Sequence, residues 1–203
     1  MEKERLHEIR RKLFHICLGS ILVFTLYFGY IGSRGIFMIL VAGGIVSLAS
    51  KYLRIPVVSW FLDFFDRPEH RKTIPGKGAL TFFFGTLLAV KLFDRDVAIA
   101  AILILALGDS ISHLIGKTYG KMKTPLNRYK NIEGTIAGTV VAGISASFFV
   151  LPAQAFIGAA AAMFFELIEI RLNEELLDDN IIVPLIAGTA IHIIRNYQTL
   201  LIL

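Results

Sequence analysis

Hydrophobic positions along the chain gather into long runs that are separated by short polar stretches. The limits of these runs are approximately 13–31, 36–53, 78–93, 97–115, 133–150, 153–170 and 180–203. Several are shorter than the roughly 20 residues that span a bilayer. We expect an all-α transmembrane helix bundle with about seven spans. Six spans, with one segment re-entrant or interfacial, is the alternative.

Two further segments have the pattern of helices that lie in the headgroup plane. In residues 2–14, Leu6, Ile9 and Leu13 share one helical face and charged residues occupy the others. Residues 56–66 place a broad apolar face opposite a polar one, as interfacial helices do. That apolar face consists of Val57, Trp60, Phe61, Phe64 and Phe65. Packing of residues 56–66 on the inner rim of the bundle is the alternative interpretation.

Composition favours the same membrane setting. Hydrophobic residues make up 55% of the 203 positions and charged residues only 18%, against roughly 25% charged in soluble domains. The mean hydropathy is +0.67. A soluble chain of this size could not bury so much apolar side chain, so we expect one integral-membrane domain over residues 1–203. The single cysteine, Cys17, excludes an intrachain disulfide and is expected in the core.

Basic residues are distributed unevenly between the two ends of the expected spans. The chain has 21 Lys and Arg residues and a formal net charge of +5. With a cytoplasmic N-terminus, all but four of these residues fall on the cytoplasmic side, as the positive-inside rule requires. The four are Arg34, Lys91, Arg95 and Arg195. We expect membrane lipids or phosphate-bearing substrates as partners rather than nucleic acid.

Small residues recur at helical spacing in the segment 133–150. Gly134, Gly138 and Ala142 follow one another at intervals of four. Such stripes let helix backbones approach closely. We expect close helix packing here, and a homodimer is possible through the same kind of face.

Ionisable residues at membrane depth are costly and mark candidate functional sites. They form five clusters, all near the expected cytoplasmic ends of spans. The clusters are Glu8, Arg11, Lys12 and His15; Lys77 within residues 75–78; Asp109, Ser110, His113, Lys117 and Lys121; Lys130 and Glu133; and Glu166, Glu169, Asp178, Asp179 and Asn180. Carboxylates can hold Mg²⁺ and lysines can neutralise phosphate oxygens, so the clusters suit a metal-bound polyphosphate.

Simpler readings remain for parts of these clusters. Glu133 alone fits an acid in a first helical turn. The residues 178–180 include a candidate helix cap. Arg10 and Arg11 could anchor a span end by extending to the headgroups. The order of a Walker A phosphate-binding loop is absent from the sequence.

Taken in order, the motifs resemble those of the CTP-dependent lipid-alcohol kinases, which include dolichol kinase, phytol kinase and the CTP-using diacylglycerol kinase of fungi. The matching stretches are Arg11-Lys12-x-x-His15, Pro75-Gly76-Lys77-Gly78, Gly108-Asp109-Ser110, Gly116-Lys117-x-x-Gly120-Lys121, Lys130-x-x-Glu133-Gly134 and Asp178-Asp179-Asn180. The resemblance implies transfer of the γ-phosphate of CTP to a lipid hydroxyl, with Mg²⁺ and a cytoplasmic active site. A polyprenol or dolichol-type alcohol is the first acceptor implied; phytol, geranylgeraniol and diacylglycerol are others.

Carried onto this sequence, the resemblance implies a nucleotide site and an adjoining metal or phosphate site. The nucleotide site would contain Asp109, Lys117, Lys121, Lys130 and Glu133, and the second site Asp178, Asp179 and Asn180. We add Arg11, Lys12, Lys77 and Ser110 as phosphate contacts, and Glu166 and Glu169 as metal ligands beside Asp109, Asp178 and Asp179. The residues expected to take part in catalysis are Asp109, Lys117, Glu133, Asp179 and His15. The base for the lipid hydroxyl would be His15 or one of the acids.

Two alternative functions follow from the same residues. The phosphatidate cytidylyltransferases share a similar pattern up to Lys-x-x-Glu-Gly but transfer the CMP moiety. Their C-terminal His-Gly-Gly and Asp-Arg-x-Asp elements are missing from residues 169–180, which favours the kinase. A non-enzymatic membrane transporter or scaffold would explain the hydrophobicity but not the charged clusters on one membrane face.

Overall fold

The expected all-α class is confirmed by the computed structural model, which describes residues 2–66, 73–127, 130–168, 171–172, 175–176 and 178–202. The helices are α1 (Glu2–Tyr27), α2 (Ser33–Tyr52), α3 (Pro56–Phe65), α4 (Lys77–Leu92), α5 (Arg95–Leu103), the π-helix η2 (Ile104–Asp109), α6 (Ser110–Tyr119), α7 (Ile132–Ala146), α8 (Pro152–Glu166) and α9 (Asp179–Ile202). Within the described ranges the strands are β1 (Arg171–Leu172) and β2 (Glu175–Leu176), which pair antiparallel.

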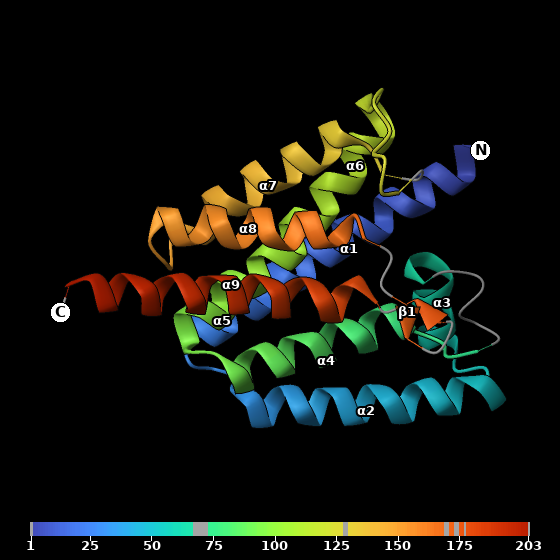
Figure 1. The fold of residues 1–203 in the computed structure, drawn as a ribbon. Helices are drawn as coiled ribbons and strands as arrows, with labels where there is room; N and C mark the ends of the chain where they lie inside the picture. The colour runs from blue at the N-terminus through green and yellow to red at the C-terminus, as the bar shows by residue number, and fades with distance from the viewer. Residues whose placement is uncertain are drawn as a thin grey trace.

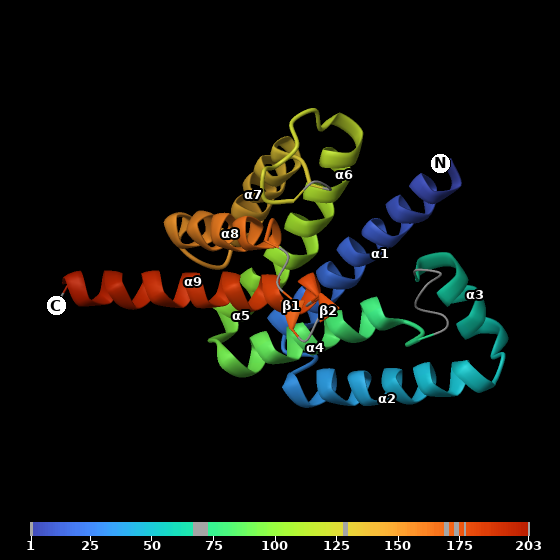
Figure 2. The same cartoon turned by 45° about the vertical axis from the view of Figure 1, so that its right-hand side comes forward.

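The long helices form one bundle with two distinct ends. Helices α2, α4, α9, α8 and α7 lie next to one another in that order, and the continuous helix α5–η2–α6 passes across them (Figure 1). The N-terminus and α3 lie at one end and the C-terminus at the other, as a second view also shows (Figure 2). We call the first end the α3 end: it comprises α3, the last turns of α2, α6 and α8, and the first turns of α4, α7 and α9.

The helix α5–η2–α6 is the centre of the core. Every residue from Val97 to Ala106 is buried, and most of them are alanine or isoleucine. The π turn at residues 104–109 ends at Asp109. A π turn inside an α-helix often occurs at a functional site, because it changes the direction of the side chains that follow.

The expected close packing of α7 is confirmed. A Cβ atom on Gly138 would lie 2.6 Å from the carbonyl oxygen of Gly108 in η2. One on Gly134 would overlap the carbonyl oxygen of Ser112 in α6. The glycine stripe therefore holds α7 directly against the backbone of η2 and α6, next to Asp109.

Helix α3 begins at Pro56 and packs one side of its apolar face on the bundle, while its place in the headgroup plane stays a prediction. The rings of Phe61 and Phe65 lie 5.1 Å and 4.7 Å from the ring of Phe14 in α1. Val57 and Trp60 are exposed. One side of the helix thus packs on the bundle while the other points outward.

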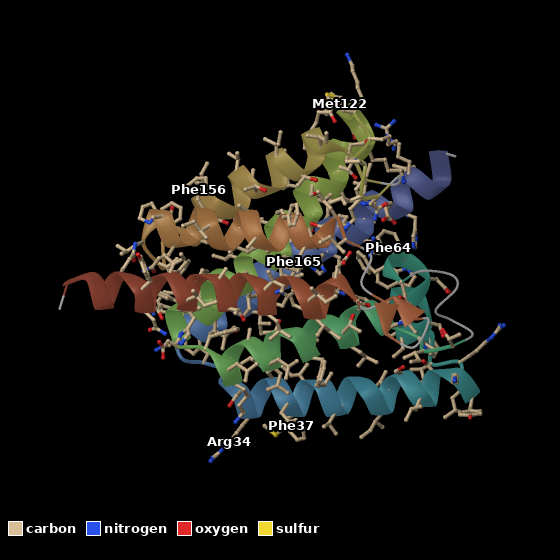
Figure 3. All side chains as sticks on the ribbon, viewed as in Figure 1. Arg34, Phe37, Phe64, Met122, Phe156 and Phe165 are labelled. Carbon is tan, nitrogen blue, oxygen red and sulfur yellow. The ribbon has the colours of Figure 1, made fainter. Side chains whose placement is uncertain are left out.

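Each of the seven apolar runs overlaps a helix of the described chain, but the number of membrane spans stays a prediction. By length and composition, two helices of the described chain could cross a membrane: Ser33–Tyr52 and Arg95–Tyr119. The second is largely buried inside the bundle, whereas α2 is largely exposed. Figure 3 shows Phe37 of α2 pointing away from the bundle. The expectation of a buried Cys17 was wrong, because this face of α1 is exposed.

Candidate active site

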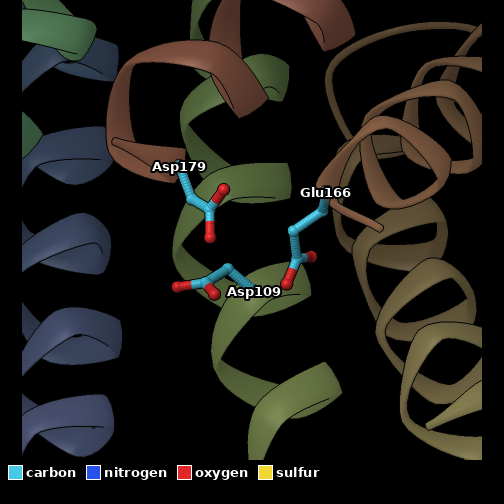
Figure 4. Close-up of side chains that lie close together, drawn as sticks. All are labelled: Asp109, Glu166 and Asp179. Atoms are coloured by element: carbon cyan, nitrogen blue, oxygen red, sulfur yellow. The ribbon is translucent and has the colours of Figure 1, made fainter. Parts of the chain in front are cut away.

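Three carboxylates from three different helices meet at the α3 end. Asp109 ends η2, Glu166 ends α8 and Asp179 begins α9. Figure 4 shows their side chains converging. One oxygen of each lies within 4.8 Å of the others, and within the described residues this is the one group with such spacing. We call it the carboxylate group.

Two lysines neutralise most of this negative charge. The Nζ atom of Lys12 lies 2.8 Å and 2.7 Å from the two carboxylate oxygens of Asp109. The Nζ atom of Lys130 lies 2.7 Å from Oε1 of Glu166 and 3.5 Å from Oδ2 of Asp179. Burial opposes the charge on Lys130, but attraction by Glu166 and Asp179 outweighs it and raises the Lys130 pKa above its usual value. Lys130 is therefore protonated in the site.

The donor atoms of the carboxylate group suit a divalent cation. Hard cations such as Mg²⁺ and Ca²⁺ prefer carboxylate oxygens. The Oε2 atom of Glu166 is buried and has no hydrogen-bond partner in the described part of the chain. A buried oxygen without a partner is costly, and a cation between the three carboxylates would satisfy it.

A basic pocket adjoins the carboxylate group on the side of α6, α7 and α8. It has a volume of about 370 Å³. Its lining, which defines the basic pocket, is Ser112, His113, Gly116, Lys117, Gly120, Lys123, Lys130, Asn131 and Glu166. Glu166 of the carboxylate group and its partner Lys130 also line the basic pocket, so the pocket directly adjoins the carboxylate group.

The loop between α6 and α7 is fastened beside this pocket by side chains from the start of α7. The Nδ2 atom of Asn131 donates to the carbonyl of Gly116 at 2.5 Å. The carboxylate of Glu133 accepts from the backbone N–H groups of Lys121 and Met122 at 2.9 Å and 3.0 Å. These bonds hold the start of the loop, between Gly116 and Met122, against the start of α7.

A second, smaller pocket lies on the side of α1, α3, α4 and α9. We call it the His15 pocket; its volume is about 50 Å³ and its polar lining includes His15, Arg11 and Asn180. The Nε2 atom of His15 lies 4.0 Å from Oδ2 of Asp109, and the His15 ring packs edge-on against Phe82 with centroids 4.7 Å apart. This Nε2 atom is buried without a hydrogen-bond partner among the described residues.

Asn180 closes the His15 pocket on the α9 side. Its Nδ2 atom donates to the carbonyl oxygen of Gly78 at 3.2 Å and to Oγ1 of Thr81 at 3.0 Å. These bonds join the first turn of α9 to the first turn of α4. They also bring the stretch at residues 75–78 to the same site as Asp179, as the order of motifs suggested.

Several residues predicted for the site lie apart from the carboxylate group. Asp178 caps the start of α9, since its Oδ1 atom accepts from the backbone N–H of Asn180 at 3.0 Å. Glu133 fastens the α6–α7 loop instead. Lys77 and Lys121 line neither pocket. Glu169 lies outside the described residues.

Others are placed beside the group. Lys117 lines the basic pocket. Arg11 lines the His15 pocket and pairs with Glu8 at 2.6 Å. Ser110 follows Asp109 and is fully buried, with no hydrogen-bond partner for its hydroxyl in the described chain.

Sequence reasoning missed several residues that shape these pockets. Phe82 contacts His15, and Thr81 contacts Asn180. Lys123 and Asn131 line the basic pocket. Thr81 lies one helical turn after Gly78, which is the one signal that could have indicated it.

No family model matches the sequence. No solved structure matches it either. An uncharacterized protein of Methanocaldococcus jannaschii is 28% identical over 192 residues, which cover 92% of this chain and 94% of that protein. CTP-dependent diacylglycerol kinase 1 of Eremothecium gossypii is 26% identical over 149 residues, or 70% of this chain and 46% of the kinase. Probable phytol kinase 2, chloroplastic, of Oryza sativa subsp. japonica is 29% identical over 197 residues, or 88% of this chain and 63% of that protein.

This chain thus spans about half the length of the Eremothecium kinase and under two thirds of the rice protein. The resemblance to CTP-dependent lipid kinases that the motifs predicted is confirmed by these relatives.

Proposed function

We propose that this chain is a CTP-dependent lipid kinase that transfers the γ-phosphate of CTP to the hydroxyl group of a lipid alcohol. The observation that carries the proposal is the position of the carboxylate group between the basic pocket and the His15 pocket. Relatives named CTP-dependent diacylglycerol kinase and phytol kinase support CTP as donor and a lipid as acceptor.

The basic pocket is the proposed site of the nucleotide phosphates. Lys117, Lys123 and Lys130 supply positive charge, and Gly116 and Gly120 leave the backbone open to close approach. A volume of about 370 Å³ falls in the range of small-molecule sites. The pocket ends at Glu166, so a triphosphate lying in it would present its last phosphate to the carboxylate group.

Asp109, Glu166 and Asp179 would hold Mg²⁺. The metal would neutralise charge on the transferred phosphoryl group, as in other phosphoryl transferases. Lys12 and Lys130 balance the rest of the charge, which leaves the site ready for an anionic substrate.

The acceptor hydroxyl would enter from the His15 pocket. Its oxygen would form a bond to the γ-phosphorus while the bond to the oxygen bridging the β- and γ-phosphates breaks, and the hydroxyl proton would pass to His15 or to one of the carboxylates. CDP and a lipid phosphate are the products. The two pockets share no lining residue and approach the carboxylates from different helices, which suits an in-line displacement. His15 would orient the hydroxyl by a hydrogen bond.

The finer assignments form part of the same proposal. The acceptor would be a polyprenol or dolichol-type isoprenoid alcohol, with phytol, geranylgeraniol and diacylglycerol to be compared. The chain would be a single membrane domain of about seven spans with the α3 end in the cytoplasm. Support comes from the basic residues: Lys51, Lys77, Lys117 and Lys130 belong to the α3 end. The four exceptions to the positive-inside count, Arg34, Lys91, Arg95 and Arg195, belong to the opposite end.

A transfer assay in detergent tests the proposal. We expect γ-labelled CTP and Mg²⁺ to place label in the lipid phase with at least one alcohol of that panel. Asp109→Asn and Glu166→Gln should lower the rate by more than about 100-fold, the scale of a lost electrostatic contact to the transferred group. Asp94→Asn is the matched control, because Asp94 is an acid with a 70% exposed side chain at the opposite end. Absence of label in folded protein, for every lipid, would contradict the proposal.

A further inference from the structure

An apolar groove opens on the side of the molecule where α2, α3 and α4 meet. Its volume is about 340 Å³. Gly43 and Val46 of α2, Val58 of α3 and Leu80 of α4 contribute to its walls. Ser47 is the one polar side chain among the described residues of the lining, and its hydroxyl already donates to the carbonyl of Pro75 at 2.6 Å. The groove therefore offers hydrocarbon contact and no polar recognition.

The groove adjoins the His15 pocket. Phe61, Leu62, Gly76 and Ala79 line both cavities. The apolar groove and the His15 pocket thus lie on either side of these residues, and His15 Nε2 lies 4.0 Å from Asp109. From the groove to the His15 pocket the lining changes from apolar to partly polar, as a molecule with a hydrocarbon tail and a hydroxyl head requires.

We propose that this groove between α2, α3 and α4 holds the hydrocarbon chain of the acceptor alcohol while its hydroxyl occupies the His15 pocket. The inference rests on the proposed function and extends it to the substrate class. The groove is a single cavity of about 340 Å³, and the cavity lined by Leu26 and Arg95 belongs to the opposite end and shares no residue with the His15 pocket. On this proposal the groove would take the one hydrocarbon chain of an alcohol of the isoprenoid type.

Two adjacent glycines of α2 provide a matched pair of variants. A Cβ atom on Gly43 would lie 3.3 Å from Cδ2 of Leu80, so a side chain there enters the groove. A Cβ atom on Gly44 would meet no atom within 4 Å, and Gly44 is not part of the groove lining. Gly43→Leu and Gly44→Leu make the same change in composition and helix propensity at neighbouring positions, and differ in whether the groove is filled.

Kinetics with a long and a short isoprenoid alcohol test the groove. Gly43→Leu should raise KM for geranylgeraniol by roughly tenfold or more, the scale on which extra methylenes are discriminated. KM for CTP and the use of geraniol should stay close to wild type, and Gly44→Leu should match wild type throughout. Equal effects of the two variants on geranylgeraniol would overturn the inference.

Photolabelling of the wild-type protein tests the groove without depending on catalysis or on how well a variant folds. A geranylgeraniol analogue with a diazirine near the end of its chain is bound without CTP, irradiated and mapped by mass spectrometry. Adducts on the groove residues of α2, α3 and α4 are expected. Adducts confined to the outer face of α2, or to the cavity near Arg95, would overturn the groove while leaving the kinase proposal intact. Groove adducts in a protein that transfers no phosphate would support the groove and refute the kinase.

Discussion

Removing the charge of Lys12 should destabilise the whole α3 end, because its ammonium compensates a buried carboxylate. The side chains of Lys12 and Asp109 are only 5% and 10% exposed, and Nζ contacts both carboxylate oxygens. Loss of one partner of such a pair costs about 3–5 kcal/mol. We therefore expect Lys12→Met to cost about 3 kcal/mol, which is roughly a hundredfold shift in the unfolding equilibrium.

A double variant separates the ion pair from simple loss of packing. Lys12→Met combined with Asp109→Asn removes both charges, so the two changes should cost less together than the sum of the single variants, by about 2 kcal/mol. The free energies of unfolding would be measured by denaturant titration in detergent without divalent cations. Lys51→Met is the control, since Lys51 is an exposed lysine in the last turn of α2. The reasoning fails if Lys12→Met is as stable as Lys51→Met, or if the two costs simply add.

Three further variants test other parts of the account. Glu133→Gln keeps an acceptor for the loop N–H groups, so its kcat should fall far less than the roughly 10²–10⁴-fold expected for a catalytic acid or base; a fall of that size in a transfer assay would restore the catalytic role. Gly138→Leu would force α7 away from the carbonyl of Gly108, and thermal melting should show marked destabilisation; unchanged melting would disprove the close packing. Burial raises the pKa of Glu8, but the His113 ring and a neighbouring arginine outweigh it and hold that pKa well below its ordinary 4.5. The charged Glu8 therefore stabilises the fold at pH values above about 4.5, and this stabilisation is lost as the pH falls below that value. Acidification from about pH 6 to about pH 3 should lower the melting temperature of wild type more than that of Glu8→Gln. Equal losses in the two proteins would refute this.

The helices could be predicted because each apolar run is long enough to dictate a helix regardless of its neighbours. The central helix α5–η2–α6 shows the limit of prediction from apolar runs. The run 97–115 predicted the helix Arg95–Tyr119 closely, but nothing in its composition indicated the π turn at residues 104–109. Cys17 was misplaced for a similar reason: an apolar run does not reveal which of its faces points outward.

The sequence indicated which residues belong to the candidate site better than it indicated the contacts between them. Motif order indicated that Asp109 and Asp179 share a site, and their carboxylates do approach each other. The pair of Lys12 and Asp109 was not predicted, because 97 residues separate them and Lys12 follows two arginines that resemble a headgroup anchor. Local spacing also could not tell Glu133, which binds loop N–H groups, from an acid that faces the substrate.

The most direct test of the central claim is to follow which phosphorus of CTP reaches the lipid. Purified protein in detergent with Mg²⁺ would receive CTP labelled separately at the α and the γ positions, together with geranylgeraniol, diacylglycerol or phosphatidate. The account predicts γ label in the lipid phase, no α label there, and CDP as the soluble product. Transfer of α label with release of pyrophosphate would contradict it and identify a cytidylyltransferase instead.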